Sequence, residues 1–232
     1  MNFLELPVGK RRYLDIARRL AGDIENGRYI AGQRLPPERE LAQSLNVSRT
    51  TVREALLALE IMRFIEIRVG AGVFVLAEAK RGHTEIAEPD SAPPSDVLAA
   101  RRILEGETAA LAAQHATASD IEALHRATEE MAGTINKIER FDAADADFHA
   151  TIAAAAGSDV LAAFVSDLWQ MRDSSMWALW YDQTRKAENR RRSVEDHRAI
   201  LRAIERGMPD IARTAMQSHL DVLAERFYQI KL

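Results

Sequence analysis

Asp145 and His149 have the residue types and the spacing of a metal-binding pair. Residues four apart lie on one face of an α-helix, so a carboxylate oxygen and an imidazole nitrogen at these positions can reach one ion. The same spacing also suits a hydrogen-bonded pair on an exposed helix surface. Because two ligands do not complete a protein metal site, the pair predicts one only together with ligands from other parts of the chain.

A second group of residues has the chemistry of DNA recognition. Ser48 has the type and position of an N-cap for a helix whose apolar residues recur at helical spacing: Val52, Ala55, Leu56 and Leu59. Arg49, Thr50 and Arg53 are then expected to point outward. Arginine presents a planar set of donors that matches guanine O6 and N7, and hydroxyls at a helix N-terminus favour phosphate. The segment therefore predicts a helix that enters the major groove of DNA.

The elements around this helix predict a winged helix-turn-helix domain over residues 1–78. Pro36 and Pro37 cannot continue a helix but permit a new one to begin. Periodicity and turn residues predict helices over residues 10–26 and 38–45, a strand over 64–69, a turn at Gly70–Gly72 and a second strand over 73–76. The glycine-containing tip of this two-stranded wing can approach a neighbouring groove of DNA.

The composition changes after residue 78. Residues 79–95 contain three prolines and lack apolar periodicity, which predicts a linker. Residues 96–232 are rich in alanine and leucine and have almost no strand pattern, so they predict an all-α bundle of about six helices. Boundaries between these helices are expected near residues 116–119, 133, 157, 182 and 207–209. The predicted fold is therefore mainly α, with two domains of unequal size.

Charge and composition restrict the function classes. The net charge is −4, but residues 1–79 hold 12 Lys and Arg against 10 Asp and Glu, and the remainder is acidic. A small basic excess is weak support for DNA binding by itself, since a solvated surface gives the same count. The chain has no cysteine, no run of 18 apolar residues and no secretion signal. We therefore expect a cytoplasmic protein without disulfides or a membrane span.

Several motifs agree in order and spacing with a known family. In the N-terminal part they are Gly32-x-x-Leu35-Pro-Pro-Glu-Arg39-Glu-Leu-Ala, Val47-Ser-Arg-Thr-Thr-Val-Arg-Glu-Ala-Leu56 and Gly70-x-Gly-Val-Phe-Val75. In the C-terminal part they are Asp96-Val-Leu-Ala-Ala-Arg-Arg-Ile-Leu-Glu105, Asp145-x-x-Phe-His149, Glu195-x-His197-x-x-Ile200 and His219. The chain resembles GntR-type bacterial transcription regulators of the FadR subgroup, which carry an all-helical effector domain called FCD.

This resemblance implies a DNA-contacting set that includes residues on the helices and at the wing: Arg39, Ser48, Arg49, Thr50, Thr51, Arg53, Arg68, Gly70 and Gly72. It also implies a homodimer that binds a palindromic double-stranded operator, because two-fold protein symmetry matches a two-fold site. The residues alone leave an alternative open, in which Arg39 and Arg53 only pair with Glu40 or Glu54 on exposed helix faces.

The resemblance also places His197 and His219 around one ion with Asp145 and His149. One carboxylate and three imidazoles form an oxygen and nitrogen set that suits zinc first, and also nickel, iron(II) or manganese. Such an ion is expected to bind a small carboxylate effector rather than to catalyse a reaction.

Two arginines are implied on the effector side of this site. Arg101 matches the family arginine that holds the effector carboxylate. Arg172 lies in a segment with Trp169, Met176, Trp177 and Trp180 at helical spacing, which is typical of core or dimer packing, although Arg172 can reach a sugar acid.

The predicted function is that of a metabolite-responsive transcription regulator, a repressor rather than an enzyme. Short segments, Leu57–Ile61, Val69–Gly72 and Trp169–Trp177, are similar to regulators of hexuronate use. Two alternatives remain: a constitutive dimeric DNA-binding protein, and a hydrolase in which the metal activates water. Loss of the metal set would have favoured the first, and no separate acid and base pair supports the second.

Overall fold

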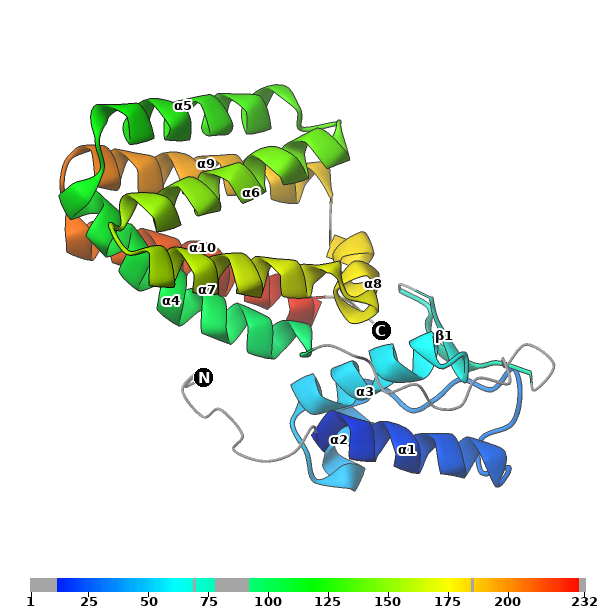
Figure 1. The fold of residues 1–232 in the computed structure, drawn as a ribbon. Coiled ribbons are helices and arrows are strands. Elements are labelled where there is room, and N and C mark those ends of the chain that lie inside the picture. Colours follow the sequence, from blue (N-terminus) through cyan, green and yellow to red (C-terminus); the bar gives the residue numbers. More distant parts are fainter. Residues whose placement is uncertain (1–11, 69, 78–91, 185, 230–232) are drawn as a thin grey trace. The chain divides into compact units, whose positions relative to one another are not determined.

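The computed structural model describes residues 12–68, 70–77, 92–184 and 186–229, which form ten α-helices and one two-stranded sheet (Figure 1). The chain divides into two units, residues 1–95 with 174–183 and 227–232, and residues 96–173 with 184–226. The predicted fold class is confirmed, because a winged helix-turn-helix comes first and a helical bundle follows.

The first unit is built around α3. Its elements are α1 (Arg12–Glu25), α2 (Glu38–Leu45), α3 (Arg49–Ile61), β1 (Ile65–Arg68) and β2 (Gly72–Val75). Helix α3 contacts α1, α2 and β1. Its apolar face, with Val52, Leu56 and Leu59, is buried, as the helical spacing of these residues predicts.

The turn between α2 and α3 depends on two local features. Asn46 ends α2 in the left-handed conformation, with φ 52° and ψ 51°, which asparagine tolerates better than most residues. Ser48 is the N-cap of α3, and its hydroxyl accepts a hydrogen bond from the Thr51 backbone N–H at 3.0 Å. The predicted N-cap is therefore confirmed, and the turn fixes the direction in which α3 begins.

The wing is an antiparallel hairpin in which Ile65 pairs with Val75 and Arg68 pairs with Gly72. Gly70 and Gly72 both have positive φ, so the turn needs the conformational freedom of glycine. Arg34 forms an isolated bridge with Phe74 and extends the pairing on the β2 side. The hairpin predicted from the alternating pattern is thus present.

The remaining helices are α4 (Pro94–His115), α5 (Ala118–Gly133), α6 (Ile138–Ala155), α7 (Asp159–Gln170), α8 (Ser175–Thr184), α9 (Ala187–Glu205) and α10 (Pro209–Gln229). Within the second unit, α6 contacts α5 and α7, and α5 also contacts α9 (Figure 1). A 3₁₀ turn, Met171–Asp173, separates α7 from α8. The described part of this region therefore has seven helices, where the sequence predicted about six.

Two other predictions concern regions between or outside the helices. The predicted linker, 79–95, lies largely outside the described residues, and α4 already begins at Pro94. Among the residues that the structure describes, no helix combines the length and the apolar character needed to cross a membrane.

Candidate metal centre and DNA-contacting face

The start of α3 presents several of the predicted DNA-contacting residues to solvent. Arg39, Ser48 and Arg49 are exposed, whereas Thr50 and Thr51 are half-buried. The Arg49 side chain is 59% exposed, and its guanidinium lies 3.6 Å from the Glu38 carboxylate. Because this contact is long and open to water, Arg49 can exchange it for a phosphate or a base.

The expectation that Arg53 points outward is wrong. Only 2% of Arg53 is exposed. Its Nε and one terminal nitrogen each donate to an oxygen of the Glu38 carboxylate at 2.6 Å, which forms a two-pronged ion pair between α3 and α2. The alternative, in which Arg53 pairs with Glu40 or Glu54 on an exposed helix face, named an ion pair but with the wrong carboxylate and the wrong exposure. Any contact of Arg53 with DNA would require the Glu38 pair to open.

Charged side chains also lie near the tip of the wing. Arg68 pairs with Glu66 at 2.7 Å, and its guanidinium lies 4.6 Å from the centre of the Phe74 ring. Gly70 is exposed, whereas Gly72 is buried against the side chain of Arg34. Arg34 is an exposed cation at the wing and was not among the predicted DNA-contacting residues. The available signal was its position within the first family motif, directly before Leu35 and Pro36.

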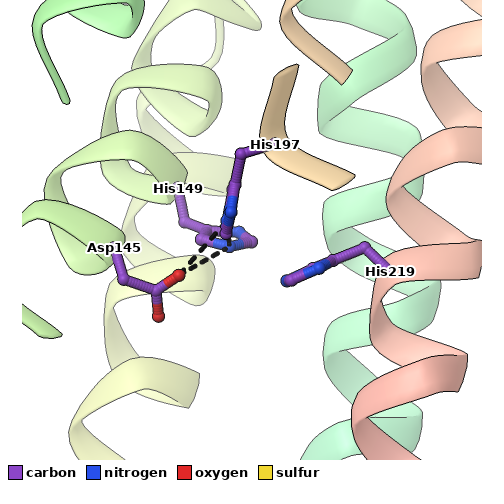
Figure 2. A group of neighbouring side chains, drawn as sticks. All are labelled: Asp145, His149, His197 and His219. Atoms are coloured by element: carbon purple, nitrogen blue, oxygen red, sulfur yellow. Dashed lines mark hydrogen bonds and ion pairs between the residues drawn. The ribbon is translucent and has the colours of Figure 1, made fainter. Parts of the chain in front are cut away.

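The second unit brings the four predicted metal ligands together. Asp145 and His149 come from α6, His197 from α9 and His219 from α10, and Figure 2 shows their side chains converging. One candidate ligand atom from each residue lies within 4.8 Å of the others. Asp145 Oδ1 is 3.2 Å from His197 Nε2 and 3.8 Å from His149 Nε2. Ligand atoms that share one ion at bond lengths of about 2.1 Å lie about 3 to 4 Å apart, so the spacing fits.

The hydrogen bonds behind the imidazoles fit a metal as well. His149 Nδ1 contacts the Glu105 carboxylate, and His197 Nδ1 lies 2.6 Å from the Ser193 carbonyl oxygen. His219 Nδ1 is 3.4 Å from Asp196 Oδ2. Since these partners accept hydrogen bonds, each Nδ1 carries the proton and each Nε2 keeps a lone pair. Metal-binding histidines have this arrangement, in which a second group orients the ring.

The contact between the imidazoles of His149 and His197 supplies the sharpest test of fit. His149 Nε2 and His197 Nε2 are only 3.2 Å apart, and both are lone-pair acceptors when their Nδ1 atoms donate. Burial lowers the pKa of His149 despite the nearby Glu105 charge, and burial followed by the charge of His197 lowers the pKa of His219 to about 4. Two Nε2 lone pairs that face each other at this distance repel unless a proton or a metal ion lies between them, so the donor set fits a metal ion.

The two carboxylates at this site stay ionised, although Glu105 is buried and Asp145 is half-buried. Burial acts to raise the pKa of Asp145, but its contacts with His197, His149 and Arg172 outweigh that effect and hold the pKa well below its usual range. Burial likewise acts to raise the pKa of Glu105, and Arg101 and His149 reverse it. Asp145 can therefore serve as an anionic ligand, and Glu105 is a buried anion next to the candidate ligand His149.

The two predicted effector arginines both lie against the indole of Trp169. The guanidinium of Arg101 is 4.3 Å from the centre of a Trp169 ring, and that of Arg172 is 4.0 Å from one. Arg101 is buried and its Nε donates to Glu105 at 2.5 Å. Arg172 is half-buried and lies 3.6 Å from Asp145 Oδ2. Arg102, the neighbour of Arg101, instead pairs with Asp221 at 2.7 Å.

The predicted site residues did not include three residues around the candidate ligands. Glu105, Trp169 as a hydrogen-bond donor and Asp196 all contact the ligands or their partners. Spacing gave a signal for two of them: Glu105 is four residues after Arg101, and Asp196 immediately precedes His197. The contact of Trp169 with Glu105 joins residues 64 positions apart, which no local pattern predicts.

A winged helix-turn-helix followed by a helical bundle defines a class of bacterial transcription regulators. Residues 12–75 match the bacterial regulatory proteins of the gntR family, and residues 96–222 match the FCD domain. The chain belongs to the GntR family and carries an FCD domain, which confirms the predicted resemblance. It is a DNA-binding transcription regulator, and the prediction that it is not an enzyme agrees with the names of its relatives.

Two relatives are similar to nearly the whole of this chain. The Uxu operon regulator of Haemophilus influenzae is 34% identical, over 96% of this chain and 84% of the relative. The Exu regulon transcriptional regulator of Escherichia coli is 33% identical, over 94% of this chain and 85% of the relative. Both belong to the hexuronate group that the short motifs predicted. The solved structure of E. coli McbR/YncC, at 20% identity, covers 94% of this chain and 97% of its own with a TM-score of 0.53, and it shows the shared fold.

Proposed function

We propose that this regulator binds operator DNA as a homodimer and that a small carboxylate, held at a metal ion in the FCD domain, alters that binding. The observation that carries the proposal is the convergence of Asp145, His149, His197 and His219, with each imidazole oriented by an acceptor at Nδ1. Such a set serves to hold an ion and, through it, an anion. We propose that the protein acts as a repressor in the cytoplasm.

The ion would bind the effector rather than activate water. Four protein ligands leave open positions on a five- or six-coordinate ion, and zinc, nickel, iron(II) and manganese all accept this donor set. The charges of a divalent ion and Arg172 exceed the single charge of Asp145, so the site favours an anion. Because the relatives control the Uxu operon and the Exu regulon, hexuronates are the first effectors to test.

The DNA-contacting residues are proposed to be Arg34, Arg39, Ser48, Arg49, Thr50, Thr51, Arg68 and the Gly70–Gly72 turn. Exposure supports Arg49 most directly, because it stands at the N-terminus of α3 beside a capping serine. We expect Arg49→Ala to abolish specific operator binding in a mobility-shift assay while the helical content stays the same. Undiminished binding by this variant would remove Arg49 from the proposal.

The homodimer is proposed to use the exposed face of α7. Val165 is the one fully buried residue among the twelve of this helix, all of which the structure describes. Val160, Phe164 and, just after the helix, Met171 are exposed at helical spacing, with Phe164 55% exposed. A stripe of this kind on a folded unit is typical of an interface. We expect Phe164→Glu to shift the chain toward a monomer in light scattering, and an unchanged dimer would place the interface elsewhere.

The whole proposal is tested with DNA selected in vitro by the full chain. Its dissociation constant would be measured by fluorescence anisotropy, with metal-loaded protein, in the presence and absence of glucuronate and galacturonate. We expect a change of about 5- to 150-fold, the usual range for coupled sites, that disappears in His149→Ala. Bound metal without any response to hexuronates or other carboxylates would favour a constitutive DNA-binding protein. Absence of transition metal from the purified chain would contradict the metal site itself.

A further inference from the structure

Glu105 is a buried acidic residue that borders the metal ligands without being one of them. It lies on α4 and is 1% exposed, whereas the four candidate ligands come from α6, α9 and α10. An ionised carboxylate in such a place is costly unless several donors surround it. The donors that contact the Glu105 carboxylate therefore indicate its role in the protein.

Four donor atoms from three different side chains surround the Glu105 carboxylate. Oε1 accepts from Arg101 Nε at 2.5 Å and from Trp169 Nε1 at 3.3 Å. Oε2 faces His149 Nδ1. Oε2 also accepts from Arg101 Nη2 at the longer distance of 3.4 Å. The carboxylate thus has one oxygen fixed by an arginine and a tryptophan, and its other oxygen has the candidate metal-binding imidazole as its nearer partner.

We infer that Glu105 is a positioning residue of the metal centre, which fixes the tautomer and the ring orientation of His149, and that Arg101 and Trp169 hold Glu105 in place. The inference rests on the proposed metal site. It gives Arg101 a role inside the protein in addition to any contact with an effector, because its Nε is already engaged by Glu105.

The three imidazoles differ in what orients them. His197 uses the backbone carbonyl of Ser193, one turn earlier on its own helix, so no side-chain substitution removes that partner. His219 faces Asp196 at the longer distance of 3.4 Å. His149 depends on a buried carboxylate from another helix, which makes it the ligand whose orientation is most sensitive to one side chain. A carboxylate behind a ligating histidine also strengthens the nitrogen as a donor.

A purely structural role is the competing explanation, in which Glu105 only balances the buried charge of Arg101. The variant Glu105→Gln separates the two roles. Arginine stays protonated, so the amide oxygen of the new side chain is expected to face Arg101 and its NH₂ group to face His149. That NH₂ group would favour the His149 tautomer with the proton on Nε2, which blocks the ligand atom.

The experiment measures the affinity of the full chain for Ni²⁺ and Zn²⁺ by competition with a chromogenic chelator. We expect Glu105→Gln to weaken binding by about 10- to 100-fold, the usual effect of removing a group behind a metal ligand. A second variant, Glu105→Asp, keeps the charge that Arg101 needs but withdraws it from His149, and we expect a loss in the same direction. Glu107→Gln is the matched control, because Glu107 is exposed on the same helix and pairs with Arg213. It should bind metal as the unchanged chain does.

A second readout does not depend on metal. Long-range ¹H–¹⁵N NMR of the metal-free chain identifies which ring nitrogen carries the proton, and we expect Nδ1 in the unchanged chain and Nε2 in Glu105→Gln. Metal affinity within threefold of the unchanged chain in both Glu105 variants, or an unchanged tautomer in folded Glu105→Gln, would overturn the inference. If Glu105→Gln does not fold, Glu105→Asp decides the outcome. If the unchanged chain binds no metal, the proposed metal site fails, and the NMR result still decides whether Glu105 positions His149.

Discussion

Replacing Arg53 with alanine should lower the stability of the DNA-binding unit, because it removes one partner of a buried ion pair. The Arg53 guanidinium and the Glu38 carboxylate form a two-pronged pair with both distances at 2.6 Å, and both side chains are less than a tenth exposed. The variant leaves the Glu38 carboxylate buried between α2 and α3 with its principal partner removed. These two helices carry the turn that directs the start of α3.

The magnitude follows from the burial of the pair. Removal of one partner from a buried ion pair costs about 3–5 kcal/mol, because the remaining charge is left uncompensated. A tenfold change in an equilibrium corresponds to about 1.4 kcal/mol. The opening equilibrium of α3 should therefore rise on the order of 100- to 3,000-fold. Most of that loss should be recovered when Glu38→Met is combined with Arg53→Met, since a neutral pair of similar volume has no buried charge.

Hydrogen exchange of the full chain measures this locally. Peptides from α3, residues 49–61, report the opening of this helix, whereas the helices of the FCD domain provide an internal reference. A local measurement is preferable because a chain with two units need not unfold in a single step.

Arg49→Ala is the matched control for this prediction. Arg49 is the same residue type, on the same helix, and faces the same carboxylate, but its contact is 3.6 Å long and its side chain is 59% exposed. Exposed pairs contribute less than about 1 kcal/mol, so exchange in α3 should change little in this variant. Exchange in Arg53→Ala within threefold of the unchanged chain, or equal to that of Arg49→Ala, would refute the reasoning.

Three further predictions concern caps, pH and metal. Asn46→Ala should destabilise the first unit by about 1–2 kcal/mol, whereas Asn46→Gly should be nearly neutral, because Asn46 has a φ of 52°; hydrogen exchange of α2 checks both. The Thr117 hydroxyl and backbone N–H donate to Asp120 and lower its pKa below the usual 3.8, so the Asp120 carboxylate stabilises α5 above that pH and the benefit disappears as the pH falls through the lowered value. Asp120→Asn should therefore lower the melting temperature at neutral pH but not in strong acid. Addition of Ni²⁺ or Zn²⁺ at 100 times its dissociation constant should stabilise the FCD domain by about 2.7 kcal/mol in a thermal-shift assay, and a chelator should reverse the shift.

The sequence predicted those parts of the fold that depend on local chemistry. The Ser48 cap, the turn at Gly70–Gly72 and the buried face of α3 each follow from residues within one or two turns of each other. The break between α7 and α8 was missed because residues 171–173 contain no glycine or proline. Ser174 was the available signal, since its hydroxyl accepts from the Trp177 backbone N–H at 3.2 Å as an N-cap does.

The orientation of Arg53 shows that helical periodicity alone does not decide whether a side chain is exposed or buried. Four residues turn a helix by about 400°, so Arg53 lies roughly 40° around the helix from Arg49. That rotation is sufficient to carry a long side chain from the solvent side to the edge of the buried face. The deciding partner, Glu38, lies 15 residues earlier and belongs to another helix. Helical spacing gives the angle of a residue, but it does not give the neighbour that the side chain meets.

The candidate metal site was predicted by two kinds of argument, one from local spacing in the sequence and one from the family resemblance. The spacing of Asp145 and His149 predicted a pair on one face of α6, which the structure has. His197 and His219 could be added only through the family resemblance, because contacts of α6 with α9 and α10 join residues 48 or more positions apart. The groups behind the imidazoles were not predicted at all, since their role depends on the packed interior.

Glu38 and Glu105 suggest a common physical reason why such residues are missed. Each is a buried carboxylate that joins a buried arginine to a second functional side chain, Arg49 in one unit and His149 in the other. Neither is expected to touch DNA, metal or effector, so motifs for those ligands do not single it out. Burial makes each charge costly unless its donors are in place, and the same cost ties the donors to one geometry.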